Sequence, residues 1–327
     1  MTSFTWRDGD RLIRFGSGAV DEAVELVGGP GYALLTTERA VEAAPHVRLA
    51  AASVHFVGYG LVEDVAGELR EEVAGDRLVA LGGGRVVDVV KALAAAGGSR
   101  AMAIPTTLSG AEMTRGHRHA RGVDPATPRV RPSVVVNDPR LSASQPVDQL
   151  AASALNAFGH AAEALCEPHG NPVVALVAAE SARLIAAAFP ARGEPARETL
   201  ALGALLGGYA LDAAALGLHH VLAQTLVREL GVGHGPANAV LLPHTLGALA
   251  WRFPARFDDL TAALGEDPAV VAGRVCALTG ATRLGELGVA GDALPRCADA
   301  AAARDELEHT PPRASRAEIL ALYEHAH

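Results

Sequence analysis

Short apolar runs alternate with longer helix-like stretches along the first 145 residues of the chain. The runs are four or five residues long, and each is bounded by Gly, Pro or polar residues. They comprise residues 32–36, 53–57, 77–81, 101–104 and 133–136. Between them lie stretches with a helical pattern, such as residues 60–74 and 85–96. This alternation is typical of a parallel sheet whose strands are joined by crossover helices.

The pattern changes near residue 146, after which long Ala- and Leu-rich segments follow without a convincing strand. The candidate helices span residues 147–166, 172–188, 197–216, 219–230 and 238–251. We therefore predict an α/β domain over residues 1–145 and an all-helical domain over residues 146–327. A cleft between two such halves is the expected place for a binding site.

Composition and charge narrow the range of partners. Half of the 327 residues are hydrophobic and 4% are aromatic, which suits a tightly packed α/β or all-α protein. The formal net charge is −9 and there is no Lys/Arg tract, so we expect neither nucleic acid nor an anionic membrane surface as a partner. Net charge does not describe the field inside a site, so a small anionic substrate remains compatible with it.

The cysteines and the apolar runs indicate a cellular location. Cys166, Cys276 and Cys297 lack CxxC spacing and read as reduced thiols of a cytoplasmic protein. The first residues contain no apolar signal region, and no apolar run reaches the ~18 residues that a membrane helix needs. We therefore expect a soluble, cytoplasmic protein.

Three glycines stand where a strand gives way to a helix. Gly82, Gly83 and Gly84 would allow a tight turn and let a phosphate approach the backbone N–H groups of the helix N-terminus. The spacing is not the GxGxxG fingerprint, so an ordinary glycine-rich turn is an equally good interpretation.

A second loop, rich in hydroxyl groups, follows the next predicted strand. Thr106, Thr107 and Ser109 could donate hydrogen bonds to a ribose or a phosphate. The alternative is a Ser/Thr-rich turn that caps the next element.

Histidines and one asparagine stand out in the helical half. Asn156 and His160 are four residues apart and would lie on one face of a helix. If His220 and His234 meet that face, three histidines and an amide come together. Three histidines with a carboxylate would suit a divalent metal, but Asn is a neutral and weaker ligand.

In their order along the chain, these motifs resemble the iron-containing (group III) alcohol dehydrogenase superfamily. The segments that carry the resemblance are Gly82–Lys91, Pro105–Glu112, Asn137-Asp138-Pro139, Asn156 with His160, Gly217–His220 and His234–His244. The resemblance implies a Rossmann-like domain followed by an all-α domain, the fold shared with dehydroquinate synthase. It also implies a nicotinamide cofactor, bound by Gly82, Gly83, Gly84, Asp88, Lys91, Thr106, Thr107 and Ser109.

The metal ligands implied by the resemblance are one Asp and three His. Here Asn156 takes the position of the Asp, while His160, His220 and His234 keep the histidines. We therefore expect no catalytic metal; if one is bound, these three histidines would hold it.

The maleylacetate reductase branch of the superfamily is the most similar. It shares the Asn, a double His like His219-His220, and a segment similar to Gly170–Leu176. The resemblance implies a metal-independent, NAD(P)H-dependent reduction of maleylacetate to 3-oxoadipate, or of a similar unsaturated oxo-acid, in the degradation of aromatic compounds. Because His234–Asn238 looks more like the metal-dependent enzymes, the alternative is an Fe- or Zn-dependent alcohol dehydrogenase. A binding protein that has lost catalysis is a third interpretation.

Roles for the histidines follow from the charge that develops on a substrate oxygen. His220 and His234, protonated or neutral, are the candidates to stabilise it, and His160 or His220 could donate the proton. Asn156 could orient a histidine or bind a substrate carboxylate. Further candidate contacts to an anionic oxo-acid are Arg115, His117, Arg118, His219, Gln224 and His244. The segment with Arg115, His117 and Arg118 could equally be a solvated loop.

One position bears on the choice between NADH and NADPH. Thr37 stands where NAD-preferring relatives have Asp, and Arg39 could pair with a 2′-phosphate. Glu38 acts in the opposite direction, so we expect both cofactors to be used. We also expect a homodimer.

Overall fold

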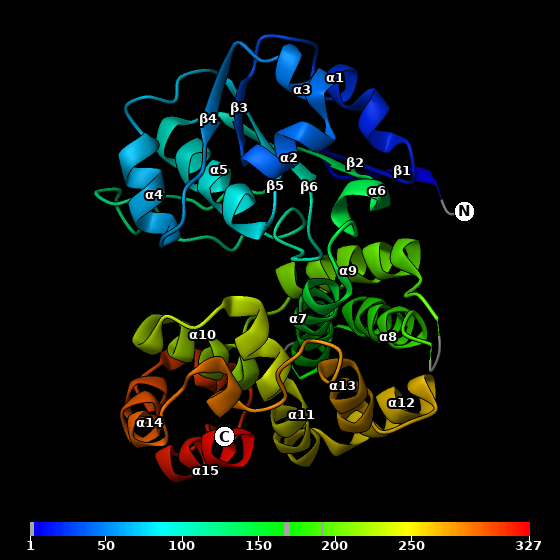
Figure 1. Ribbon diagram of the computed structural model, residues 1–327, viewed down its shortest axis with the longest axis vertical. Coiled ribbons are helices and arrows are strands. Elements are labelled where there is room, and N and C mark those ends of the chain that lie inside the picture. Colours follow the sequence, from blue (N-terminus) through cyan, green and yellow to red (C-terminus); the bar gives the residue numbers. More distant parts are fainter. Residues whose placement is uncertain (1–2, 167–170, 191–192) are drawn as a thin grey trace. The chain divides into compact units, whose positions relative to one another are not determined.

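The computed structural model describes residues 3–166, 171–190 and 193–327 (Figure 1). The chain divides into two compact units, Met1–Ser144 and Gln145–His327. None of the described helices is long and apolar enough to cross a membrane.

The first unit is built on one seven-stranded sheet. Its strands are β1 (Phe4–Asp8), β2 (Arg11–Phe15), β3 (Ala33–Thr36), β4 (Ser53–Phe56), β5 (Arg77–Gly82), β6 (Arg100–Pro105) and β7 (Val134–Asn137), in the order β1-β2-β7-β6-β5-β3-β4. The five strands predicted from apolar runs are β3 to β7, and they pair in parallel.

The hairpin of β1 and β2 makes the sheet mixed rather than purely parallel, which corrects the prediction. The two strands are antiparallel, with Asp8 opposite Arg11, so only Gly9 and Asp10 form the loop. Gly9 has a φ of 63°, a conformation that glycine adopts without strain, and two-residue loops of this kind join antiparallel strands. β2 then continues the sheet by pairing in parallel with β7.

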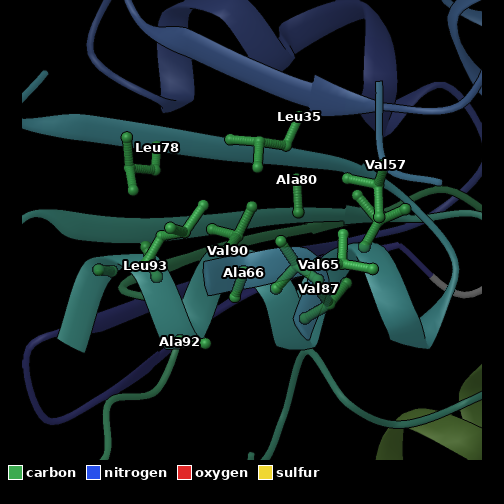
Figure 2. Close-up of a cluster of buried hydrophobic side chains, with 14 of the residues drawn as sticks. Leu35, Val57, Val65, Ala66, Leu78, Ala80, Val87, Val90, Ala92 and Leu93 are labelled. Carbon is green, nitrogen blue, oxygen red and sulfur yellow. The ribbon is translucent and has the colours of Figure 1, made fainter. Parts of the chain in front are cut away.

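Helices cover both faces of this sheet. They are η1 (Ala19–Glu22), α1 (Ala23–Leu26), α2 (Glu38–Ala43), α3 (Pro45–Leu49), α4 (Val62–Leu69), α5 (Gly84–Gly97) and α6 (Pro139–Ser142). Successive residues of β5 point to opposite faces. Leu78 and Ala80 therefore pack with Val90 of α5, as Figure 2 shows, while Val79 and Leu81 join the core on the other face.

The second unit is helical throughout its described residues, as predicted. Its helices are α7 (Val147–Leu165), α8 (Pro172–Ala187), α9 (Arg197–Asp212), α10 (Leu218–Leu230), α11 (His234–Arg252), α12 (Pro254–Leu264), α13 (Pro268–Cys276), α14 (Leu294–Ala302) and α15 (Arg316–Ala326), with short turns η2 (Leu284–Leu287), η3 (Gly291–Ala293) and η4 (Asp305–His309).

Helix α7 lies at the centre of this unit, in contact with α8, α9 and α11. Fifteen of its nineteen residues are buried, so it is enclosed on nearly every side. Polar side chains on such a helix need partners, because an unpaired polar group is costly inside a protein. Asn156, His160 and Glu163 are the residues of α7 to which this applies.

Candidate functional site

The glycine loop and the hydroxyl-rich loop pack directly against each other in the first unit. None of Gly82, Gly83 and Gly84 has a positive φ, so space rather than backbone conformation favours glycine here. A Cβ on Gly83 would lie 2.9 Å from Cγ2 of Thr107, and one on Gly84 would lie 2.9 Å from Cβ of Ser109. The structure therefore brings together two groups of residues predicted to bind the cofactor.

The N-terminus of α5 opens at this contact. Gly83 is its N-cap and offers no side chain, so no side-chain hydrogen bond caps the first N–H groups of the helix. Free N–H groups and the helix dipole together favour an anion such as a phosphate. This arrangement is compatible with the predicted dinucleotide site.

Lys91 is the only lysine in the sequence and is fully buried. Its Nζ lies 2.7 Å from Oδ1 of Asp88, one turn earlier on α5. It also donates to the carbonyl oxygens of Ala111, Thr114 and Gly116, at 3.0, 3.1 and 2.7 Å. Through these three carbonyl contacts Lys91 holds the loop over residues 111–116 in place. Its direct contact with a cofactor stays a prediction.

The other predicted cofactor residues have local roles of their own. Thr37 is the N-cap of α2 and accepts a hydrogen bond from the N–H of Ala40 at 3.3 Å. Arg39 donates to the hydroxyl of Ser144 at 3.4 Å. The N–H of Thr106 donates to the carbonyl oxygen of Gly82 at 3.0 Å, which ties the two loops together. Whether these residues also contact a cofactor stays a prediction.

The predicted basic anchors differ in their exposure. Arg115 and Arg118 are exposed, whereas His117 is buried. Nδ1 of His117 lies 2.9 Å from the carbonyl oxygen of Arg118, and its Nε2 accepts from the N–H of Val130 at 3.4 Å. Burial lowers the pKa of His117 to about 4. His117 is therefore a buried residue of the loop that burial keeps uncharged near pH 7, and its contact with a substrate stays a prediction.

The buried carboxyl group of Glu112 should make the stability of the protein depend on pH. Burial raises the pKa of its carboxyl group from 4.5 to about 7. A raised pKa contributes stability that is full below pH 4.5 and is lost as the pH rises through 7. The wild type should therefore lose about 3 kcal/mol relative to Glu112→Gln between pH 4.5 and 8, since each pKa unit corresponds to about 1.4 kcal/mol. Urea unfolding of both proteins across this range measures the difference.

The exposed Glu180, which is paired with Arg183 on α8, supplies the matched control. Glu180→Gln should show no comparable change with pH over this range, because an exposed ion pair contributes little to stability. Parallel curves for the wild type and Glu112→Gln would contradict the raised pKa of Glu112.

The second unit brings three of the predicted histidines together. His160 of α7 stacks on His220 of α10, with ring centroids 4.7 Å apart and an angle of 19° between the planes. His219 meets His220 edge-on at 4.8 Å. Gly159 makes room for both rings, since a Cβ there would lie 2.9 Å from Cδ2 of His219 and 3.3 Å from Cε1 of His220.

Glu163 belongs to this cluster, and the sequence reasoning missed it. Its Oε2 lies 2.6 Å from Nδ1 of His220, and both side chains are buried. The signal was present, because Asn156, His160 and Glu163 follow one another at helical spacings of four and three residues. Burial raises the pKa of Glu163, while hydrogen bonds from the backbone of Gly217, His219 and His220 act in the opposite direction.

The buried histidines are neutral near pH 7. Burial lowers the pKa of His219 and of His220 to about 3, and that of His160 well below its usual value. Nδ2 of Asn156 lies 3.4 Å from Nε2 of His160, and Nδ1 of His219 lies 2.9 Å from Oγ1 of Thr245. The sequence left the charge of His220 open; the structure favours the neutral form in the resting protein.

His234 and Asn238 share the first turns of α11, which begins four residues before the predicted start. His234 is exposed, and its Nε2 lies 3.2 Å from Nδ2 of Asn238. His234 is nevertheless near enough to lower the pKa values of His160 and His220. It therefore lies at the edge of the cluster rather than within it.

Gln224 and His244, two further residues predicted to contact the substrate, lie beside other side chains of the protein. Oε1 of Gln224 accepts a hydrogen bond from Nη2 of Arg304 at 2.9 Å. His244 has a pKa lowered by burial, with His325 and Arg283 as the neighbouring charges. Whether Gln224 or His244 also contacts a substrate stays a prediction. In the segment Gly170–Leu176, Asn171 caps α8, and Gly170 lies outside the described residues.

The three histidines considered as metal ligands are His160, His220 and His234, of which His160 and His220 stack on each other. Over residues 3–166, 171–190 and 193–327, no group of three or more His, Cys, Asp or Glu side chains is placed to hold an ion. His160 faces the amide of Asn156, and His234 faces Asn238 on its own helix. Whether a metal is bound near Asn156 and His160 stays a prediction, and the chemistry below is derived from the residues of this chain alone.

Comparison with known proteins assigns the family. The family described as "Fe-containing alcohol dehydrogenase family, C-terminal" matches residues 150–327, and "Iron-containing alcohol dehydrogenase" matches residues 36–144. Maleylacetate reductase 1 of Rhodococcus opacus is 33% identical over 330 residues, covering 92% of this chain and 90% of that protein.

Two further relatives agree with this match. Maleylacetate reductase 2 of Cupriavidus pinatubonensis is 36% identical over 211 residues, which are 61% of this chain and only 58% of that protein. The crystal structure of maleylacetate reductase from Agrobacterium tumefaciens has a TM-score of 0.84 and 31% identity, and covers 100% of this chain and 98% of that chain. The resemblance seen in the motifs is confirmed: the chain belongs to the iron-containing alcohol dehydrogenase family, in the branch of the maleylacetate reductases.

Proposed function

We propose that this protein is an NAD(P)H-dependent reductase of maleylacetate, or of a similar unsaturated oxo-acid, and that it needs no metal. The observation that carries the proposal is the match to a maleylacetate reductase over 92% of the chain. The cluster around His220 supports it, because neutral imidazoles and the amide of Asn156 offer hydrogen bonds where a metal-dependent relative would need a charged ligand set.

The first unit would bind the cofactor through its backbone. The uncapped N–H groups at the start of α5 suit a diphosphate, and the contact of Gly83 with Thr107 fixes the two loops around it. Bound nicotinamide supplies the hydride. Thr37 and Arg39 leave room for either NADH or NADPH, as the sequence suggests.

The histidines of the second unit would stabilise the negative charge on the substrate and transfer the proton to it. With Nε2 facing the amide of Asn156, neutral His160 carries its proton on Nδ1, which has no partner among the described residues. This N–H can stabilise the substrate oxygen on which negative charge develops. Nε2 of His220 also has no partner there, and it can take a proton and pass it to the substrate carbon. One hydride and one proton then complete the reduction of the double bond.

The activity itself is the first test. Purified protein should oxidise NADH and NADPH in the presence of maleylacetate, with turnover unchanged by chelator and by added Zn²⁺ or Fe²⁺. The decrease of cofactor absorbance measures both rates. A panel of small aldehydes provides the comparison: turnover of aldehydes only after metal addition would replace this proposal with a metal-dependent alcohol dehydrogenase.

A further inference from the structure

Glu163 combines complete burial with two close contacts to His220. Its side chain is 0% exposed, and Oε2 lies 2.6 Å from Nδ1 of His220. Oε1 accepts the backbone N–H of His220 at 3.3 Å, and the backbone N–H groups of Gly217 and His219 act to lower the pKa of the carboxyl group against the effect of burial. These donors belong to the N-terminal turn of α10, a helix of thirteen residues whose dipole favours a negative charge there.

This set of donors determines where the proton of His220 lies. A carboxylate that receives backbone N–H groups is an acceptor, and an ionised carboxylate has no proton to give. Because the backbone N–H of His220 already donates to the same carboxyl group, we assign Glu163 as the acceptor in the short contact and place the N–H on Nδ1 of His220. In a neutral imidazole, Nε2 then carries a lone pair. That atom is buried and has no partner among the described residues.

We propose that Glu163 is a positioning residue, which holds His220 in the Nδ1–H tautomer and in one orientation, so that Nε2 is the atom offered to the substrate. This inference rests on the proposed reductase function. The role of Glu163 is one of geometry: it fixes the orientation of the His220 ring through Nδ1 and leaves Nε2 facing away from the carboxyl group.

The packing around the pair supports a positioning role. His160 covers one side of the His220 ring, and His219 meets it edge-on, so the ring cannot turn without displacing both neighbours. A wholly buried carboxylate is costly unless it is fully hydrogen-bonded. The neighbours of Glu163 on α7, Ala162 and Ala164, are apolar and buried, so packing alone would favour an apolar residue here.

Glu163→Gln tests the inference with almost no change in shape. The amide oxygen can accept from Nδ1 or from the backbone, but the NH2 group then faces another donor. We expect kcat with maleylacetate to fall about 100-fold, since general acid–base catalysis by a positioned side chain contributes about 10²- to 10⁴-fold. The KM for NADH should stay the same. Glu163→Asp keeps the charge and should restore part of kcat. Glu180→Gln, on the exposed face of α8, is the matched control and should keep wild-type kcat.

Nitrogen-15 NMR of labelled histidines reads the tautomer directly. The His220 signals, identified by their loss in His220→Gln, should show a protonated Nδ1 in the wild type and a mixture of tautomers in Glu163→Gln. A protonated Nε2 in the neutral wild type would overturn the inference, and so would unchanged kcat in folded Glu163→Gln. The wild-type spectrum is decisive even if Glu163→Gln does not fold. Absence of maleylacetate turnover in the wild type would refute the proposed function but leave the NMR test valid.

Discussion

Replacing Lys91 by Met is expected to lower the free energy of unfolding by about 1–3 kcal/mol or more, the cost of leaving buried acceptors without their donor. The ammonium is fully buried and lies 2.7 Å from Asp88. Without it, the carboxylate loses its counter-ion, and the carbonyl oxygens of Ala111, Thr114 and Gly116 lose their common donor. Urea unfolding monitored by circular dichroism measures the loss.

Two further variants make this prediction specific. Lys91→Arg keeps the charge, but a planar guanidinium cannot place its donors as a compact ammonium does, so it should also destabilise the protein. Arg100→Met is the control, because Arg100 is exposed and lies 3.9 Å from Asp76. Removing such a surface pair should cost about 0–1 kcal/mol. If Lys91→Met is no less stable than Arg100→Met, the structural role assigned to Lys91 is wrong.

Gly159→Ala is expected to lower kcat about 100-fold, the scale of loss seen when reacting groups move by about 1 Å. The added Cβ would lie 2.9 Å from His219 and 3.3 Å from His220, so at least one ring must shift. A shift of His220 would lengthen its 2.6 Å contact with Glu163 and break the stack with His160. Steady-state kinetics with maleylacetate and NADH measure the change.

The control for Gly159→Ala is another helical glycine in the same unit. A Cβ on Gly203 of α9 would lie 2.9 Å from Cγ1 of Ile185 on α8, so the two substitutions crowd their sites equally. Gly203→Ala should cost about 1–3 kcal/mol of stability through overpacking, yet leave kcat within a few-fold of the wild type. Equal losses of kcat in both variants would mean that general destabilisation, rather than displaced imidazoles, is responsible.

The sequence predicted the framework well where apolar runs and glycines coincide. The run that became β5 ends at the glycines that open α5, and this combination has few other structural solutions. The β1–β2 hairpin escaped prediction because neither of its short strands, FTWRD and RLIRF, contains an apolar run of more than two residues. The sequence pattern predicted that this helix begins at residue 238, after Pro236. Helix α11 begins at His234 instead, because Pro236 then lies in the first turn, where a helix tolerates proline.

The candidate site was harder to predict, because a polar residue in a helix is usually exposed, whereas most of the polar residues of this site are buried. Glu163 in an Ala-rich segment resembles an exposed helix residue, and only the fold shows that α7 is enclosed. The charge state of His117 likewise depends on burial, which no local pattern reveals. The pairing of His160 with His220 followed from motif order, whereas the ring geometry required the structure.

The single lysine has a consequence for the surface chemistry of this protein. All other basic side chains, apart from histidine, are arginines, so the folded chain presents no accessible ε-amino group. Acylating reagents, and enzymes that acetylate or ubiquitinate lysine, can reach that amine only after the loop over residues 111–116 has opened. The rate at which Lys91 is modified would therefore measure how often the first unit opens, and not how exposed lysine is on the folded surface.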